Sequence, residues 1–153
     1  MFNIIAKNTK TLEILEWFGY STREDAQYDI DNKVEKASVS LVGFDKTDIL
    51  EPGASETLTI DVDGDYVASY DAYGAGTYIL DAGDYYFTAA TDAHNAVNNV
   101  LAAKGYTPEN TERMDAAGNK DLVCTWNNPE LDTTTYATSD AGTKIENQFD
   151  SSD

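Results

Sequence analysis

Apolar and polar residues alternate with a period of two in several short stretches of the chain. The clearest lies at residues 57–62, where Leu58, Ile60 and Val62 fall on one face and threonine and aspartate on the other. This alternation is typical of a β-strand that buries one face. Further extended segments are expected at residues 36–42, 66–70, 77–80, 84–90 and 121–126.

Turn-forming residues separate these stretches. Pro52-Gly53 is the strongest signal, because proline presets the first central torsion of a turn and glycine accepts the positive φ that follows. Short strands with turns about every 8 to 12 residues predict a mainly β fold, an antiparallel β-sandwich. The later turns are marked by Asp63-Gly64, Gly74, Gly76 and Ala82-Gly83.

Residues 93–104 have helical periodicity instead. Val97 and Val100 recur at helical spacing, Asp92 is suited to cap the start, and Gly105 can end the helix. The sequence therefore predicts one α-helix added to the sandwich.

The two ends of the chain differ from this pattern. A short amphipathic helix is expected over residues 8–19, where Leu12 and Leu15 recur at roughly helical spacing and Gly19 can end it. Residues 21–32 are polar and acidic, which favours a loop. Residues 127–153 have few apolar anchors and are expected to form a flexible tail or linker.

The charge of the chain narrows the choice of partners. Its 153 residues suit one domain, and 28 acidic against 10 basic residues give a formal charge of -18. Such a field repels phosphate backbones and anionic lipid, so no nucleic-acid or membrane partner is expected. No apolar run has the length of a transmembrane helix, and residues 1–10 lack the order of a signal peptide. A cytoplasmic location is the expectation.

Motifs for catalysis or metal binding are not evident. Asp61-Val-Asp63-Gly-Asp65 resembles the start of a helical calcium loop, but Tyr66 and Ala72 stand where that loop needs glycine and glutamate. An acidic turn is expected there, with no metal and no cofactor. A glycosidase needs two carboxylates in one cleft, and nothing in the spacing singles out two of the 28 acids. No catalytic residue is therefore assigned.

Cys124 is the only cysteine, which excludes an internal disulfide. Its neighbours have the composition of a strand, and the only histidine, His94, is distant in sequence. We expect Cys124 to be a buried and unreactive thiol.

Two groups of residues are candidates for contacts with glycan or with another domain. The segment Asp92-Ala-His94-Asn95 fits a helix cap with an exposed imidazole, and a sugar-contacting or docking role is the alternative. The seven aromatic residues between Tyr66 and Phe87 suit a core or an interface, although carbohydrate modules also stack sugars on exposed rings. The candidate contact residues are Tyr70, Tyr73, Tyr78, His94 and Asn95.

Several motifs in residues 36–106 resemble the fibronectin type III-like domain of bacterial family 3 glycoside hydrolases of the β-glucosidase type. The family signature reads leucine-x-glycine-phenylalanine, then leucine-x-proline-glycine-x-serine. The matching runs are Leu41-Val-Gly-Phe-Asp-Lys, Leu50-Glu-Pro-Gly-Ala-Ser-Glu-Thr, Ala68-Ser-Tyr-Asp71 and Leu80-Asp-Ala-Gly-Asp-Tyr-Tyr86.

The resemblance implies a fibronectin type III or immunoglobulin-like sandwich and a non-catalytic, accessory role. Those enzymes remove terminal β-linked sugars with an aspartate nucleophile that lies in a barrel domain. The implied partners are the catalytic barrel and α/β domains of a parent glycosidase, and carbohydrate is a further candidate. Residues 92–106 look like an elaboration found in a bacterial subgroup, and residues 144–150 are similar to its connection into the barrel.

One part of the chain departs from the family pattern. Residues 6–9 and 28–33 fit it, whereas residues 11–27 do not resemble the family's second strand, which predicts an exposed sheet edge. We therefore divide the chain into an atypical segment at 1–27, a sandwich at 28–126 and a tail at 127–153. A free-standing carbohydrate-binding module is the alternative to an enzyme fragment. A secreted adhesion-type sandwich is disfavoured because no export signal is seen.

Overall fold

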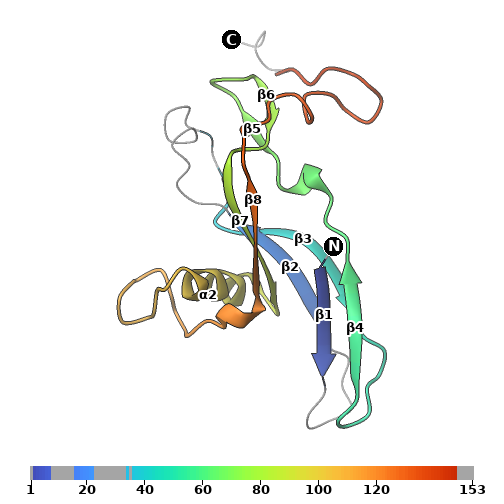
Figure 1. Ribbon diagram of the computed structural model, residues 1–153, viewed down its shortest axis with the longest axis vertical. Coiled ribbons are helices and arrows are strands. Elements are labelled where there is room, and N and C mark those ends of the chain that lie inside the picture. Colours follow the sequence, from blue (N-terminus) through green and yellow to red (C-terminus); the bar gives the residue numbers. More distant parts are fainter. Residues whose placement is uncertain (1, 8–15, 23–33, 35, 148–153) are drawn as a thin grey trace.

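The computed structural model describes residues 2–7, 16–22, 34 and 36–147. Within this part the chain forms an antiparallel β-sandwich with one α-helix, as predicted (Figure 1). Strand β1 (Phe2–Lys7) pairs with β4 (Ser55–Ile60), and β5 (Ser69–Asp71) forms a hairpin with β6 (Thr77–Ile79). The four-stranded sheet has the order β3 (Ser40–Lys46), β2 (Glu16–Thr22), β7 (Gly83–Ala90), β8 (Val123–Asn128).

The alternation in β4 gives the buried face that the sequence predicts. Leu58 and Ile60 are buried, whereas Thr57 and Thr59 are exposed. They are buried apolar residues like Tyr85 and Phe87, the large rings of β7. The main core cluster contains Val42, Leu80, Tyr85 and Phe87, and Val62, Val67 and Tyr136 pack against it.

The turns also follow the expected chemistry. The backbone N–H of Ala54 donates to the oxygen of Glu51 at 2.9 Å, and Gly53 between them has a φ of 86°. The extended segment expected at 66–70 is shorter, because a 3-10 turn, η1 (Gly64–Tyr66), precedes β5. Strand β3 starts later and ends later than the 36–42 stretch predicts.

The N-terminal helix expected over residues 8–19 is wrong at residues 16–19, which belong to β2; residues 8–15 lie outside the described residues. Strand β2 pairs with β3 on one side and β7 on the other, so it occupies the middle of the sheet. The expectation of an exposed sheet edge near residues 11–27 is therefore wrong for residues 16–22, because β2 is paired on both sides. Pairing on both sides supplies backbone hydrogen bonds that outweigh a weak local helical pattern. Ser21 and Thr22, expected in a loop, also lie in β2.

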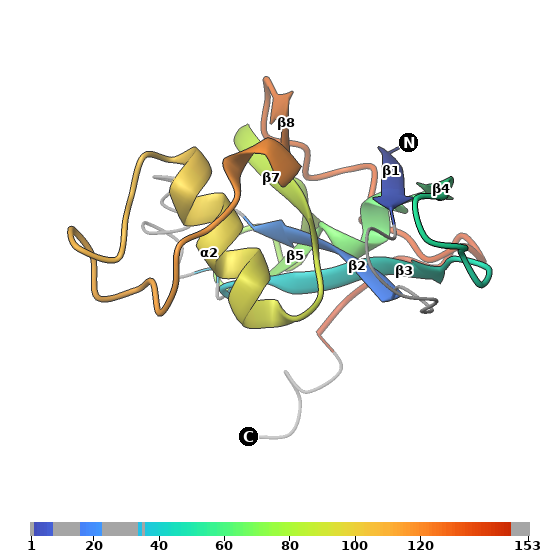
Figure 2. The same ribbon diagram turned by 90° about the horizontal axis from the view of Figure 1, so that it is seen from below.

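Helix α2 (Ala93–Ala103) confirms the prediction for residues 93–104. The Asp92 carboxylate caps it by accepting the N–H of Asn95 at 2.9 Å, and Gly105 follows with a φ of 88°. Figure 2 shows α2 lying along β7. Asn99 fixes this packing, because its side-chain amide donates to the oxygens of Thr88 and Ala89 at 3.2 Å. Lys104 lies over the Tyr86 ring at 4.8 Å.

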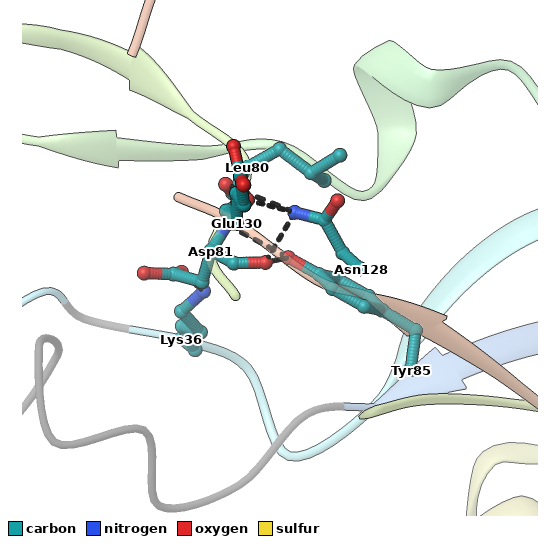
Figure 3. Close-up of polar contacts among 6 residues, drawn as sticks. All are labelled: Lys36, Leu80, Asp81, Tyr85, Asn128 and Glu130. Carbon is teal, nitrogen blue, oxygen red and sulfur yellow. Dashed lines mark hydrogen bonds and ion pairs between the residues drawn. The ribbon is translucent and has the colours of Figure 1, made fainter. Parts of the chain in front are cut away.

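Residues 129–147, expected to be an extended tail, instead fold back onto the sandwich. The side-chain amide of Asn128 donates to the backbone oxygens of Asp81 and Glu130, each at 2.7 Å (Figure 3). Leu80 and Asp132 then exchange two backbone hydrogen bonds at 2.8 Å. Long-range backbone pairing of this kind cannot be seen in local composition.

The buried Asp81 anchors the same region. Its carboxylate forms an ion pair with Lys36, whose side chain is also largely buried, and its backbone N–H donates to the Tyr85 hydroxyl at 3.0 Å (Figure 3). One aspartate thus joins the segment before β3, the β6–β7 turn and the core tyrosine.

Candidate functional site

Three of the five candidate contact residues come together on the β5–β6 hairpin. Tyr70 and Tyr78 are cross-strand partners, and their ring centroids lie 5.4 Å apart at an interplanar angle of 73°. The Tyr70 hydroxyl donates to the backbone oxygen of Gly76 at 3.2 Å. Tyr73 lies in the turn and is 76% exposed. We call these three residues the tyrosine hairpin.

The fully buried Asp71 holds the turn of the hairpin in place. Its two carboxylate oxygens accept the backbone N–H groups of Gly74 at 2.8 Å and Ala75 at 2.6 Å. Hydrogen bonds to a charged acceptor are among the stronger ones in proteins. This role of Asp71 was not predicted, although an aspartate just before a glycine-rich turn is the usual signal for it.

A hollow of 330 Å³ lies beside the hairpin. Tyr78 lines one side, and residues of the segment expected to be a tail line another. The Tyr136 hydroxyl lies so close to Gly64 that a Cβ at that position would overlap it. Burial, with smaller contributions from Asp65, Asp132 and Asp63, raises the pKa of Tyr136. The lining residues are Asp65, Ala68, Tyr78, Tyr136, Thr138, Ser139, Asp140 and Ile145.

The other two candidates, His94 and Asn95, lie in the first turn of α2. Figure 1 shows this helix well separated from the β5–β6 hairpin along the long axis of the molecule. The five candidate residues therefore do not form one site.

The contacts of His94 and Asn95 match the helix-cap interpretation. The His94 ring is exposed and its Nδ1 lies 3.2 Å from the Asp115 carboxylate. The Asn95 side-chain amide donates to Thr91 at 2.9 Å. A hydrogen bond from Asn98, followed by the charge of His94, lowers the pKa of Asp115.

The acidic run at residues 61–65 forms the turn that the sequence predicts. The Asp63 carboxylate caps η1 by accepting the N–H of Asp65 at 3.1 Å. Across the described residues, no group of three or more histidine, cysteine, aspartate or glutamate side chains is placed to share a metal ion. Nor does any helix in that part of the chain have the length and apolar composition needed to cross a membrane.

Cys124 is exposed, so the prediction of a buried thiol is wrong. It lies in β8, an edge strand whose residues from 124 to 127 are all exposed. The strand-like composition around Cys124 was identified correctly, but composition does not tell a central strand from an edge.

The fold and the matched residues define a class of domain. Residues 26–93 match the family model described as "Fibronectin type III-like domain". This part of the chain therefore resembles a fibronectin type III-like domain, and the match ends at the first residue of α2.

The relatives of this domain are β-glucosidases. Over 68 residues the chain is 41% identical to the β-glucosidase of Ruminococcus albus, a match that covers 42% of this chain and 7% of that protein. The structure is similar to a β-glucosidase of Kluyveromyces marxianus, with a TM-score of 0.55 and 18% identity over 84% of this chain and 12% of that one. A β-glucosidase of Paenibacillus barengoltzii has a TM-score of 0.51 and 18% identity, over 94% of this chain and 15% of that one.

These two structural likenesses show the fold alone, because their identities are low. The chain spans only a small part of each relative. It resembles the fibronectin type III-like part of a β-glucosidase.

Proposed function

We propose that this chain is a non-catalytic accessory domain of a family 3 glycoside hydrolase that removes terminal β-linked glucose or similar sugars. The observation that carries the proposal is the 41% identity to a β-glucosidase over 68 residues that make up 7% of that enzyme. Its partners are the catalytic barrel and α/β domains of a parent enzyme. The role of the domain is to pack against them and stabilise them.

The use of the buried acids supports a non-catalytic role. Asp71 and Asp81 are the two fully buried carboxylates among the described residues. Asp71 binds backbone N–H groups of a turn, and Asp81 binds Lys36. A glycosidase needs one carboxylate that attacks the sugar or activates a water molecule, and another carboxyl group that protonates the leaving group. Neither buried acid is placed for that work.

Two measurements test the proposal. The first is the DNA sequence on both sides of the reading frame, where a barrel-coding stretch is expected in frame or displaced by a shift. The second is an assay of the purified chain with 4-nitrophenyl β-D-glucoside, for which we expect no hydrolysis above the buffer rate. Hydrolysis by the isolated chain, or flanking DNA without any hydrolase sequence, would overturn the proposal.

The tyrosine hairpin favours a second candidate function, a carbohydrate-binding module. Tyr73 and Tyr78 expose rings with a polar edge, and the turn that carries them is held by hydrogen bonds, which suits stacking against a sugar. If this function is correct, titration with cello-oligosaccharides should change the tyrosine fluorescence of the original chain. The same titration should not change the fluorescence of the Tyr73→Ala variant. No change up to about millimolar ligand, the weak limit of useful affinity, would exclude this function.

A further inference from the structure

An apolar groove of 430 Å³ runs between β3 and β4. Its floor includes Val42 and Ile60, which are both buried. Three large apolar side chains at the groove remain in water: Leu41 is 48%, Phe44 66% and Tyr66 65% exposed. Single exposed apolar residues are normal on protein surfaces. Three of them around one apolar hollow are typical of an interaction site.

The groove results from a specific irregularity in β3. Gly43 pairs with Gly19 of β2, and Leu41 pairs with Tyr20, so Val42 is an extra residue in the ladder. Such a bulge breaks the regular alternation of side chains. At Gly43 the two sheets approach so closely that a Cβ would overlap the side chain of Ile60. Leu41 and Phe44 therefore lie on either side of Gly43, a position that cannot carry a side chain because Ile60 lies against it.

The charge around the groove selects the kind of occupant. Asp61 lines the groove, Asp45 follows Phe44 on β3, and Asp65 precedes Tyr66, and all three are exposed. Lys46 is the one basic residue on β3. A second copy of a chain with a formal charge of -18 would bring like charges together at this rim. An apolar side chain surrounded by basic residues is complementary to the groove.

We propose that the β3–β4 groove is the surface through which this domain docks onto the catalytic part of a β-glucosidase-type enzyme. An apolar side chain of that partner enters between Leu41, Phe44 and Tyr66, and a basic residue faces Asp61. This inference rests on the proposed function. The related enzymes leave ample protein to supply such a surface, because the chain spans 7% to 15% of their lengths.

Site-specific crosslinking in the organism that encodes the chain tests the groove. The photo-reactive amino acid p-benzoylphenylalanine is placed at Phe44 in one version of the full natural polypeptide and at Tyr73 in another. Both positions carry exposed aromatic rings, so Tyr73 is a matched control. We expect position 44 to crosslink to glycosidase catalytic sequence, in the same polypeptide or in a separate one. Mass spectrometry identifies the crosslinked peptides.

The other outcomes separate the two proposals. A crosslink to catalytic sequence from position 73 but not from position 44 would overturn the groove and leave the accessory function standing. A crosslink from position 44 to a second copy, or to an unrelated protein, would also overturn the groove. If neither position reaches glycosidase sequence, the groove is overturned, and the flanking DNA and the hydrolysis assay then decide the accessory function separately.

Affinity measurements then define the chemistry of the contact. Once the partner sequence is known, Phe44→Ser should weaken its association with the chain by about tenfold or more, because aromatic anchors dominate interface energies. Tyr106→Ser, at another exposed aromatic ring, should change the affinity by about twofold or less. Asp61→Asn should flatten the salt dependence between about 0.05 M and about 0.5 M. Thermal unfolding of each variant checks that the fold is retained. Equal effects of the two serine variants would contradict the assignment.

Discussion

The β3–β4 groove and the tyrosine hairpin both expose aromatic rings, but their surroundings differ. In the groove, Leu41 and Phe44 have no polar atom in their side chains, and the floor beneath them is apolar. On the hairpin, every exposed ring carries a hydroxyl, and the turn is fixed by the carboxylate of Asp71. The first surface gains free energy mainly by leaving water. The second can also orient a polar ligand by hydrogen bonds.

This difference distinguishes two roles, sugar binding and docking to another domain, that composition alone does not distinguish. A rigid, hydroxyl-bearing surface suits sugars, whereas an apolar groove with a charged rim suits another protein domain. The count of ten tyrosines in the chain points to neither role by itself. Which aromatic residues lie together, and on what floor, decides between them.

Removing the buried carboxylate of Asp71 is expected to have the largest effect on stability. It tests whether this carboxylate fixes the turn of the tyrosine hairpin. Asp71→Ala removes the acceptor of two backbone N–H groups in a partly buried turn and should lower the free energy of unfolding by about 3 kcal/mol. Urea unfolding measures this loss. Asp48→Ala is a matched control at an exposed position and should change stability by about 0.5 kcal/mol or less. Similar values for both variants would contradict the role of Asp71.

Filling the close approach at Gly43 tests how the groove is built. Gly43→Ala introduces a Cβ that overlaps Ile60 and should cost about 2 kcal/mol of stability. Ile60→Ala removes the overlapping atoms, so the double variant should be more stable than the two single effects predict when added, by about 1 kcal/mol. A double-mutant cycle from urea unfolding gives this coupling energy. Simple additivity would mean that the two sheets do not meet at Gly43.

The pH dependence of stability at alkaline pH tests whether Tyr136 is buried in the hollow beside the hairpin. Burial raises the pKa of Tyr136 from its ordinary value of 10.0, so the folded state keeps the phenol proton to a higher pH than the unfolded state does. The contribution is present below pH 10.0 and is lost as the pH rises through the raised value.

Tyr136→Phe should remove this contribution. Between about pH 8.5 and about pH 11, the unfolding free energy of the original chain should fall more steeply than that of the variant. Other tyrosines and the lysines titrate in both proteins and cancel in the difference. Parallel curves would show that the Tyr136 hydroxyl titrates alike in the folded and unfolded states.

The smallest effect is expected at His94, which lies in α2 and lines neither surface. Its ion pair with Asp115 is exposed to solvent, and such pairs contribute little. His94→Gln should leave the free energy of unfolding unchanged within experimental error and should leave crosslinking from Phe44 unaffected. A larger loss in thermal or urea unfolding would show that the start of α2 depends on the imidazole.

Local patterns predicted the parts of this fold that depend on neighbours in sequence. The alternation around Leu58 and Ile60, the turn at Gly53 and the helix capped by Asp92 all agree with the structure. In each case the deciding interaction joins residues at most four positions apart, or sets which face of one element is apolar. The motif order also predicted the fibronectin type III-like domain.

Other features were decided only by tertiary structure. Residues 16–22 pair on both sides in the sheet despite a helical pattern in part of this stretch, and Cys124 is exposed because its strand lies at an edge. Tyr136 and Asp132 pack against distant parts of the chain. The groove needs a bulge in β3 and the close approach of β4. Each of these outcomes depends on which distant segments meet, and the residue types in a short window carry no information about that choice.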